Sequence, residues 1–169
     1  MATPALRLSV SNNRPRFTSI IESDPKDIIF DMDGTLADIT HRRHHVESTP
    51  KNWDAFYSSM INDKPVEAVV LMAQLLKSAG HRIIIATGRP RRYNIPTLRF
   101  LQDNDVSYDA VYLRGDTDYR PDTVVKEQML RKMRTNGYNP TIAFDDRKSV
   151  VEMWRLNDLF VFQVAEGDF

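Results

Sequence analysis

The sequence predicts an α/β fold in which a parallel sheet carries helices on both of its faces. Short apolar segments alternate along the chain with segments of helical periodicity, an order that is typical of parallel sheets. Three of the apolar segments run directly into acidic, hydroxyl or guanidinium side chains, so polar groups should gather at the carboxyl edge of the sheet. The length of 169 residues and the 41% share of hydrophobic residues suit one domain with a buried core.

The predicted elements alternate between strand and helix. We expect strands at residues 28–30, 83–86, 110–113, 141–144 and 159–164, and helices between them at residues 65–78, 96–102, 121–137 and 149–156. Proline favours the first turn of a helix, so Pro65 and Pro121 are expected to begin two of these helices. Gly80 and Gly137 are placed to end them.

Two segments lie outside this alternation. Residues 1–26 form an N-terminal extension whose first 20 residues include Arg, Ser and Thr but no acidic residue, which gives it some similarity to organelle transit peptides. The alternative is a polar tail or one added strand, because Asn12, Asn13 and Pro15 interrupt any helical period. Residues 37–64 form a small insertion after the first strand that is too short for a separate lid domain, which predicts an open site.

The insertion is expected to contain one short amphipathic helix. Its apolar and aromatic side chains recur at helical spacing, at Trp53, Phe56, Tyr57, Met60 and Ile61. Such a stripe usually faces a core, so we expect it to pack rather than to offer a platform for nucleobases.

Composition excludes several classes of protein. The 23 basic and 23 acidic residues cancel, which argues against sequence-independent coating of nucleic acids. The chain has no cysteine, which excludes a disulfide framework, a thiolate zinc site and a cysteine nucleophile. The longest apolar run, residues 68–73, is far shorter than the roughly 20 residues that a membrane-spanning helix needs. From the lack of an export signal we expect a cytoplasmic protein.

Polar side chains follow three of the predicted strands. Asp31 follows the first strand, Thr87 the second, and the pair Asp145-Asp146 the fourth. The carboxyl ends of parallel strands meet at one edge of a sheet, so these carboxylates should lie close together and repel one another. A hard cation such as Mg²⁺ relieves that repulsion, and with it an anionic substrate such as a phosphate group can bind.

Four motifs in this order resemble those of the haloacid dehalogenase (HAD) superfamily of phosphotransferases, which have a Rossmannoid fold. They are Asp31-Met32-Asp33-Gly34-Thr35, Thr87, Lys126 and Asp145-Asp146. Residues 27–169 also resemble the 3′-phosphatase domain of bacteriophage polynucleotide kinases. That closer similarity is carried by residues 64–66, by residues 114–127 with Arg114, Arg120 and Asp122, and by residues 145–155 and 167–169.

The resemblance implies a role for each motif residue. Asp31 would be the nucleophile and form an aspartyl-phosphate. Asp33 would protonate the leaving oxygen and then deprotonate the attacking water. Thr87 and Lys126 would hold the transferring oxygens and offset their charge.

The resemblance likewise implies a set of ligands for Mg²⁺. They would be the Asp31 carboxylate, the Asp33 backbone carbonyl and Asp146, with water completing the octahedron. Thr35 would orient the loop. Two roles are open for Asp145, which either orients Lys126 or binds the metal directly. His41, His44 and His45 are an alternative metal site for zinc, but residues at this spacing lack a fourth ligand.

Substrate binding is expected from arginines near the carboxyl edge. Arg42, Arg89 and Asp122 match positions that the related phosphatase domain uses at its site. The two arginines would belong to a wider collar suited to a polyanion, made of Arg42, Arg43, Arg89, Arg91, Arg92, Arg114, Arg120 and Arg147.

The predicted function is a Mg²⁺-dependent phosphomonoesterase that removes a 3′-phosphate from the ends of DNA or RNA. No glycine is followed by lysine, so no kinase-type phosphate-binding loop is expected. The alternatives are a nucleotidase acting on free mononucleotides and, third, a non-catalytic module that recruits a repair partner.

Overall fold

A five-stranded parallel sheet forms the centre of the computed structural model, which describes residues 8–11, 14–17 and 24–167. Its spatial order is β7-β6-β3-β8-β9, and all neighbouring strands run parallel. The strands are β3 (Asp27–Phe30), β6 (Arg82–Pro90), β7 (Ala110–Arg114), β8 (Pro140–Asp145) and β9 (Phe160–Gln163). The predicted fold class is confirmed.

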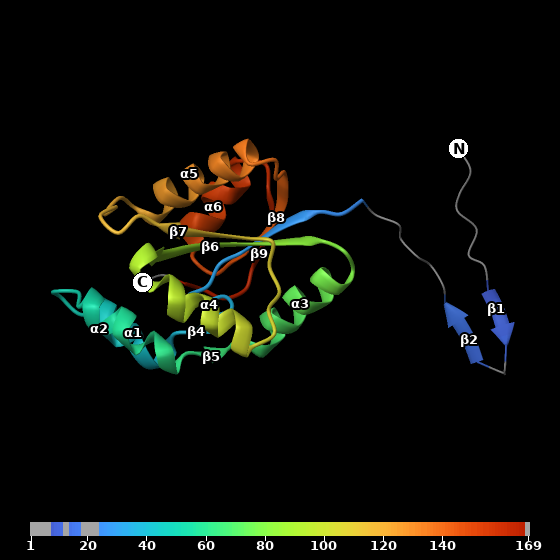
Figure 1. Cartoon of the computed structure of the whole chain (residues 1–169), viewed down its shortest axis with the longest axis horizontal. Coiled ribbons are helices and arrows are strands. Elements are labelled where there is room, and N and C mark those ends of the chain that lie inside the picture. Colours follow the sequence, from blue (N-terminus) through green and yellow to red (C-terminus); the bar gives the residue numbers. More distant parts are fainter. Residues whose placement is uncertain (1–7, 12–13, 18–23, 168–169) are drawn as a thin grey trace.

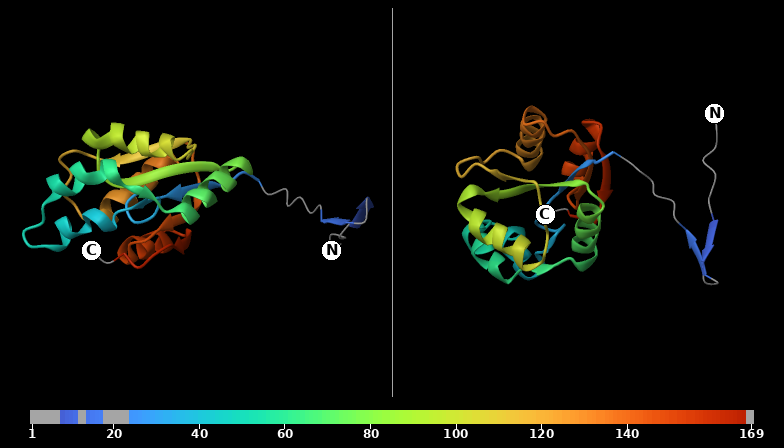
Figure 2. Two further views of the ribbon diagram at one scale, coloured as in Figure 1. Left: turned by 90° about the horizontal axis from the view of Figure 1, so that it is seen from below. Right: turned by 45° about the vertical axis from the view of Figure 1, so that its right-hand side comes forward.

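Helices cover both faces of the sheet, as Figures 1 and 2 show. One face carries α3 (Glu67–Ser78) and α4 (Asn94–Asp103), and the other carries α5 (Asp122–Thr135) and α6 (Lys148–Leu156). Side chains of each strand alternate between the two layers. Ile28 and Phe30 pack with α3 and α4, whereas Ile29 packs with α5 and α6.

The strand order places the carboxyl ends of β3 and β8 at a topological switch point. From β3 the chain moves to β6 and β7 on one side, and it then crosses to β8 and β9 on the other. The crossovers on the two sides of β3 leave a crevice outside its carboxyl end, and ligands bind at this position in open α/β sheets.

Two of the helices were predicted to begin at a proline residue. Pro121 is the N-cap residue of α5, which begins at Asp122, one residue after the predicted start. The prediction for Pro65 was wrong, because Lys64–Pro65 form the short strand β5 and α3 begins only at Glu67. β5 pairs antiparallel with β4 (Ala37–Asp38), and this pairing holds the residues before α3 extended.

The insertion contains more helix than the aromatic spacing predicts. α1 (Thr40–Glu47) precedes α2 (Trp53–Ser58) and the 3₁₀ turn η1 (Ser59–Asn62). The sequence of α1 is largely polar, so hydrophobic periodicity gives no signal for it. The insertion has a small core of its own, made of Ile39, Val46, Phe56, Tyr57 and Met60.

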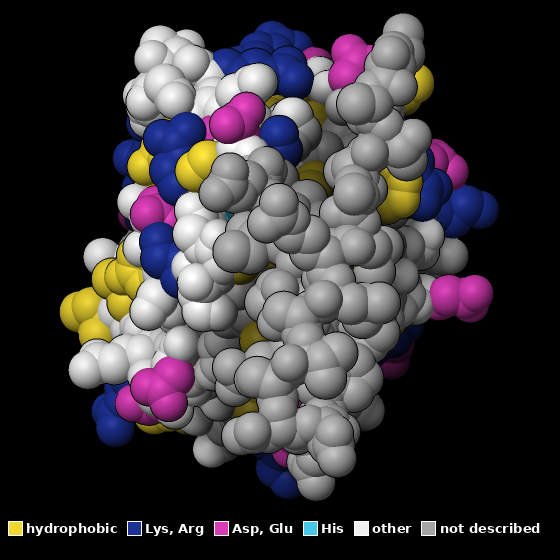
Figure 3. Space-filling model, turned by 90° about the vertical axis from the view of Figure 1, so that its right-hand side faces the viewer, with side chains coloured by type: hydrophobic (Ala, Val, Ile, Leu, Met, Phe, Trp, Pro, Cys, Tyr) yellow, Lys and Arg dark blue, Asp and Glu magenta, His cyan; other side chains and the backbone are white. Residues whose placement is uncertain are grey.

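In the N-terminal extension, β1 (Leu8–Ser11) pairs antiparallel with β2 (Arg14–Phe17), so the strand expected there has a partner within the same segment. Within the described ranges no helix is long and apolar enough to cross a membrane. At the end of the molecule where the strands begin, Figure 3 shows basic and acidic side chains mixed over the described surface.

Candidate active site

Three buried carboxylates meet at the carboxyl edge of the sheet. One oxygen each of Asp31, Asp145 and Asp146 lies within 4.8 Å of the others. Burial raises the pKa of Asp31 well above its usual range, and the charges of Asp145 and Asp146 add to this effect against the opposing pull of Lys126. Burial and the neighbouring Asp145 raise the pKa of Asp146 to about 6.

This donor set fits a hard divalent cation. Crowded, buried carboxylate oxygens are the ligands that such cations prefer, and a positive ion removes the repulsion that raises these pKa values. Of the acidic and histidine side chains that the structure describes, Asp31, Asp145 and Asp146 are the group that meets the geometric requirement. His41, His44 and His45 are not part of it. His41 Nε2 lies 3.0 Å from Asp63 Oδ1.

Lys126 reaches the carboxylates from the buried face of α5. Its Nζ lies 2.8 Å from Asp31 Oδ1 and 2.9 Å from Asp145 Oδ2. Although burial lowers the pKa of Lys126, the charges of Asp145 and Asp31 outweigh it and raise the pKa above its usual range. Lys126 is therefore a fixed cation beside Asp31.

Both oxygens of Asp145 have donors within the protein. Its Oδ2 accepts hydrogen bonds from Lys126 Nζ and, at 3.0 Å, from Trp154 Nε1, and its Oδ1 accepts one from the backbone N–H of Arg147 at 3.2 Å. Asp146 has a different environment, since its side chain accepts one weak hydrogen bond, from Thr35 Oγ1 at 3.4 Å. Of the two, Asp146 has more oxygen lone pairs left for a cation.

Glycine is required where the first loop passes Asp146. Gly34 has a φ of +88°, a conformation that side chains other than glycine rarely adopt. A Cβ atom at Gly34 would lie against the Asp146 carboxylate, and the same holds for a Cβ atom at Gly167. The backbone therefore packs directly against this carboxylate on both sides.

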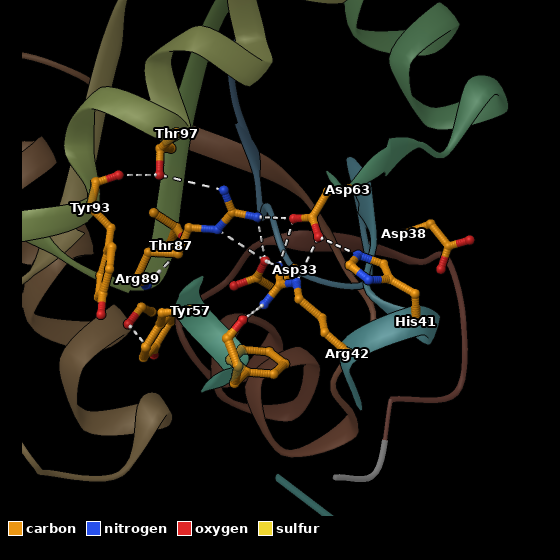
Figure 4. Close-up of polar contacts among 12 residues, drawn as sticks. Asp33, Asp38, His41, Arg42, Tyr57, Asp63, Thr87, Arg89, Tyr93 and Thr97 are labelled. Carbon is orange, nitrogen blue, oxygen red and sulfur yellow. Dashed lines mark hydrogen bonds and ion pairs between the residues drawn. The ribbon is translucent and has the colours of Figure 1, made fainter. Parts of the chain in front are cut away.

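Asp33 belongs to a buried group of two carboxylates and two guanidinium groups (Figure 4). Its Oδ1 accepts hydrogen bonds from Arg42 Nη2 at 2.6 Å and from Arg89 Nη2 at 2.5 Å. The Asp63 carboxylate accepts from Arg42 Nε at 2.6 Å and from Arg89 Nη2 at 2.7 Å. The two positive and two negative charges of Asp33, Asp63, Arg42 and Arg89 balance within the protein interior.

This group fixes the protonation state of Asp33. Burial favours its neutral form, but the charges of Arg89 and Arg42 outweigh burial and hold the pKa of Asp33 well below its usual range. Both arginines are fully buried behind Asp33. Neither lines the cavity above Asp33, so neither is placed there to bind a polyanion as the predicted arginine collar requires.

A cavity of about 560 Å³ extends outward from Asp31, Asp33, Lys126 and Asp146. α2 and the residues before it form one wall, and residues 114–122 form another. Of the predicted collar, the arginines that line it are Arg92, Arg114, Arg120 and Arg147. Arg43 pairs with Glu47 at 2.7 Å, and Arg91 borders a separate hollow beside β7.

The remaining predicted site residues lie close by. Asp122 lines the cavity, where its carboxylate accepts hydrogen bonds from Arg114 Nη2 at 2.6 Å and Arg147 Nη1 at 3.3 Å. Burial opposes ionisation of Asp122, but Lys126, Arg147 and Arg114 together lower its pKa. Thr87 is fully buried, and its Oγ1 accepts a hydrogen bond from the backbone N–H of Arg89 at 3.2 Å.

Two polar contacts of the site are not predictable from the sequence: the contact of Asp63 with the two buried arginines, and that of Trp154 with Asp145. Asp63 lies in a polar stretch at the end of the insertion, where a carboxylate usually faces solvent. Trp154 is recognisable as a core residue of a helix, but periodicity gives no indication that its indole N–H binds Asp145. Both contacts join segments far apart in the chain, so only the folded structure reveals them.

A model of the phosphatase domain of the polynucleotide kinase PNKP matches residues 25–169. The chain belongs to this family. It is 24% identical over 146 residues to a protein of Autographa californica nuclear polyhedrosis virus described as a bifunctional polynucleotide kinase/RNA ligase, with 85% of the chain and 20% of the relative covered.

Solved structures agree with this assignment. A chain of the Pnkp1/Rnl/Hen1 RNA repair complex superposes with a TM-score of 0.74 at 32% identity, over 91% of this protein and 48% of that chain. A haloacid dehalogenase-like hydrolase from Streptococcus pneumoniae shares the fold, with a TM-score of 0.58 at 14% identity, over 81% and 83% of the two chains. The chain thus spans about half or less of the polynucleotide kinase relatives, and it is a phosphatase domain of the HAD type.

Proposed function

We propose that this domain is a Mg²⁺-dependent phosphomonoesterase that removes the 3′-phosphate from polynucleotide ends. The observation that carries the proposal is the contact between the Asp31 carboxylate and Lys126 Nζ beside Asp146, at the base of a cavity large enough for a nucleotide. The RNA repair complex in which a similar chain was solved supports a nucleic acid as the substrate.

In the first step, an oxygen of Asp31 attacks the phosphorus atom of the 3′-phosphate. The bond from phosphorus to the 3′ oxygen breaks, and an aspartyl-phosphate remains on the protein. Lys126 Nζ, 2.8 Å from Asp31 Oδ1, offsets the negative charge that builds up on the transferring oxygens. Thr87, which is buried within the neighbouring strand β6, would help to hold the phosphoryl group.

Asp33 would carry the protons of both steps. The incoming phosphate brings negative charge next to Asp33, which raises its pKa and allows it to bind a proton that it gives to the leaving 3′ oxygen. The ionised Asp33 then takes a proton from the water that attacks the aspartyl-phosphate. Inorganic phosphate leaves and Asp31 is restored. Arg42 and Arg89 would keep Asp33 ionised between turnovers.

Asp31, Asp146 and the backbone carbonyl of Asp33 would hold Mg²⁺, and Thr35 and Asp145 would orient these residues and Lys126. The bound ion would neutralise negative charge on the phosphate and on the carboxylates. Asp122, Arg114 and Arg147 lie on the cavity wall, where they would position the nucleotide that bears the phosphate.

The second candidate is a nucleotidase that acts on free mononucleotides. It is favoured by the cavity volume of about 560 Å³, since pockets of this size enclose single small ligands. Both candidates use the same chemistry at Asp31 and differ only in what extends beyond the sugar.

Rates of phosphate release separate the two candidates. The substrates are one oligonucleotide with a 3′-phosphate, its twin with a 5′-phosphate, and the matching 3′- and 5′-mononucleotides, all with Mg²⁺. The proposal predicts the highest kcat/KM for the 3′-phosphorylated oligonucleotide. A higher kcat/KM for mononucleotides would establish the nucleotidase instead, and an equal rate for both oligonucleotide ends would overturn the 3′ specificity.

A further inference from the structure

An aromatic surface lines the cavity that contains the candidate nucleophile. Trp53 and Tyr57 of α2 lie on the wall above Asp31 and Asp33. Tyr57 is 9% exposed, as expected for a residue that packs in the core of the insertion. Trp53 is 44% exposed, although a large aromatic side chain usually buries most of its area. The packing role predicted for the whole stripe therefore holds for Phe56, Tyr57 and Met60, but it is wrong for Trp53 and for Ile61, which is 72% exposed.

The exposed Trp53 is held in place by a stack of rings. Its ring centroid lies 5.9 Å from that of Tyr57 with an interplanar angle of 23°, and Tyr57 stacks on Tyr93 at 4.9 Å and 27°. The hydroxyl of Tyr57 donates to the carbonyl oxygen of Gly88 at 3.5 Å. An aromatic side chain that is fixed before the ligand arrives loses little conformational entropy on binding.

The opposite wall presents a second exposed ring. Tyr119, in the segment between β7 and α5, is 90% exposed and lines the same cavity. Figure 1 shows α2 and the start of α5 at the same end of the sheet. Two aromatic side chains thus border the opening through which a substrate reaches Asp31.

Net charge contributes little attraction at the outer part of this cavity. The cations there are Lys51, Arg92, Arg114, Arg120 and Arg147, and the carboxylates are Asp54, Asp116, Asp118 and Asp122. Several of these pair with each other, such as Arg120 with Asp118 at 2.6 Å. Lys51 is an exception to these pairs, with its Nζ 5.5 Å from the centre of the Trp53 ring. A chain of phosphates would find few unopposed cations here, whereas nucleobases would find aromatic faces.

We infer that Trp53 is a stacking platform for the unpaired nucleobases next to the 3′-phosphate, an inference that rests on the proposed function. The substrate class is then single-stranded nucleic acid held through its bases, with little preference for sequence, because every base has an aromatic face. Lys51 beside the platform would contact the backbone phosphate of the same strand. Trp53 is a binding residue in this scheme and takes no part in the chemical steps.

The test removes the base from the substrate and the ring from the protein, separately and together. Single-stranded oligonucleotides with a 3′-phosphate carry either normal or abasic residues at their last two positions. Wild-type protein should lose about tenfold or more in kcat/KM on the abasic substrate, mainly through KM. Trp53→Ala should lose a similar factor on the normal substrate and respond little to base removal, whereas Trp53→Phe should keep most of the wild-type preference.

Tyr108→Ala is the matched control, because Tyr108 is a 38% exposed aromatic residue that precedes β7 at the opposite end of the sheet. It should keep the full wild-type preference for the normal substrate. Thermal unfolding of Trp53→Ala shows whether this variant is folded. The comparison of normal with abasic oligonucleotides on wild-type protein tests the inference without any variant.

The outcomes separate this inference from the proposed function. If wild-type protein hydrolyses normal and abasic oligonucleotides equally well, Trp53 is no platform, and the 3′-phosphatase activity stands. If wild-type protein shows the base preference but Trp53→Ala keeps it, the bases bind elsewhere and the inference is wrong. If wild-type protein hydrolyses p-nitrophenyl phosphate but none of the oligonucleotides, both the proposed function and the inference are wrong.

Discussion

Asp63 shows how much of this site depends on one residue that takes no part in the proposed chemistry. Its fully buried carboxylate binds Arg42 and Arg89, the two arginines that also bind Asp33. Without Asp63, two buried guanidinium groups would share one carboxylate. Removal of one partner from a buried ion group is costly because the remaining charge stays in the interior without compensation.

We therefore expect Asp63→Ala to destabilise the protein by about 3–5 kcal/mol. The measurement is the free energy of unfolding in urea. Asp103→Ala is the control, since Asp103 forms an exposed ion pair with Arg99 at 3.4 Å within α4. That variant should lose less than about 1 kcal/mol. An equal loss in both variants would contradict the importance of the buried group.

The motif residues Asp31, Asp33, Lys126, Asp145 and Asp146 could be identified from the sequence because each sits at a fixed place relative to a strand or helix. The partners of these residues could not. Arg42 and Asp63 are 21 positions apart, and their ion pair depends on how α1 and the end of the insertion pack together. The sequence places Arg42 and Arg89 near the carboxyl edge and suggests contact with substrate, but it gives no indication that both side chains are buried against Asp33.

At the level of elements, the loop after β3 packs against the loop after β8 at the carboxyl edge of the sheet. Gly34 and Gly80 have nearly the same φ, +88° and +91°. A Cβ atom would overlap the Asp146 carboxylate at Gly34, but it would meet no atom within 4 Å at Gly80. The pair therefore separates the cost of backbone strain from the cost of crowding at the site.

Gly80→Ala should cost roughly 1–2 kcal/mol of stability and leave the rate of phosphate release unchanged. Gly34→Ala should carry the same strain and also displace Asp146, which we expect to lower kcat/KM about 100-fold. Steady-state kinetics and urea unfolding of both variants measure the two effects. A Gly34→Ala variant with wild-type kinetics would show that Asp146 needs no close contact with this loop.

The elements of the sheet were largely predictable, because alternating apolar strands and periodic helices follow directly from burial. The exceptions have identifiable physical causes. Pro65 suits both a helix start and an edge strand, and pairing with β4 decided the outcome. The helix α1 buries two residues, Val46 and Arg42. Because Arg42 is charged, a search for hydrophobic periodicity finds only one apolar buried position and does not detect this helix.

On the scale of the whole molecule, the ionised carboxylates of Asp31 and Asp146 oppose folding when no cation is bound. Burial and mutual repulsion raise the pKa values of Asp31 and Asp146. A cation that binds only the folded protein stabilises it by mass action. At a Mg²⁺ concentration of 100 times Kd, the gain is about 2.7 kcal/mol, which corresponds to a rise in Tm of roughly 5–10 °C.

We expect this rise in wild-type protein and its loss in Asp146→Asn, which replaces one proposed ligand. Asp103→Asn, far from the carboxyl edge in α4, should keep the full rise. Thermal unfolding with and without Mg²⁺ measures the effect. Equal shifts in Asp146→Asn and Asp103→Asn would mean that Mg²⁺ binds somewhere other than Asp146.

The most direct test of the proposed chemistry is phosphate release from a 3′-phosphorylated oligonucleotide by wild-type protein and by Asp31→Asn, with Mg²⁺ and with excess chelator. We predict rapid release by wild-type protein with Mg²⁺, loss of release in chelator, and, with Mg²⁺, a rate about 10³-fold lower in Asp31→Asn than in wild-type protein. A folded Asp31→Asn protein that releases phosphate at the wild-type rate would contradict the assignment of Asp31 as the nucleophile, and undiminished release in chelator would contradict the dependence on a metal ion.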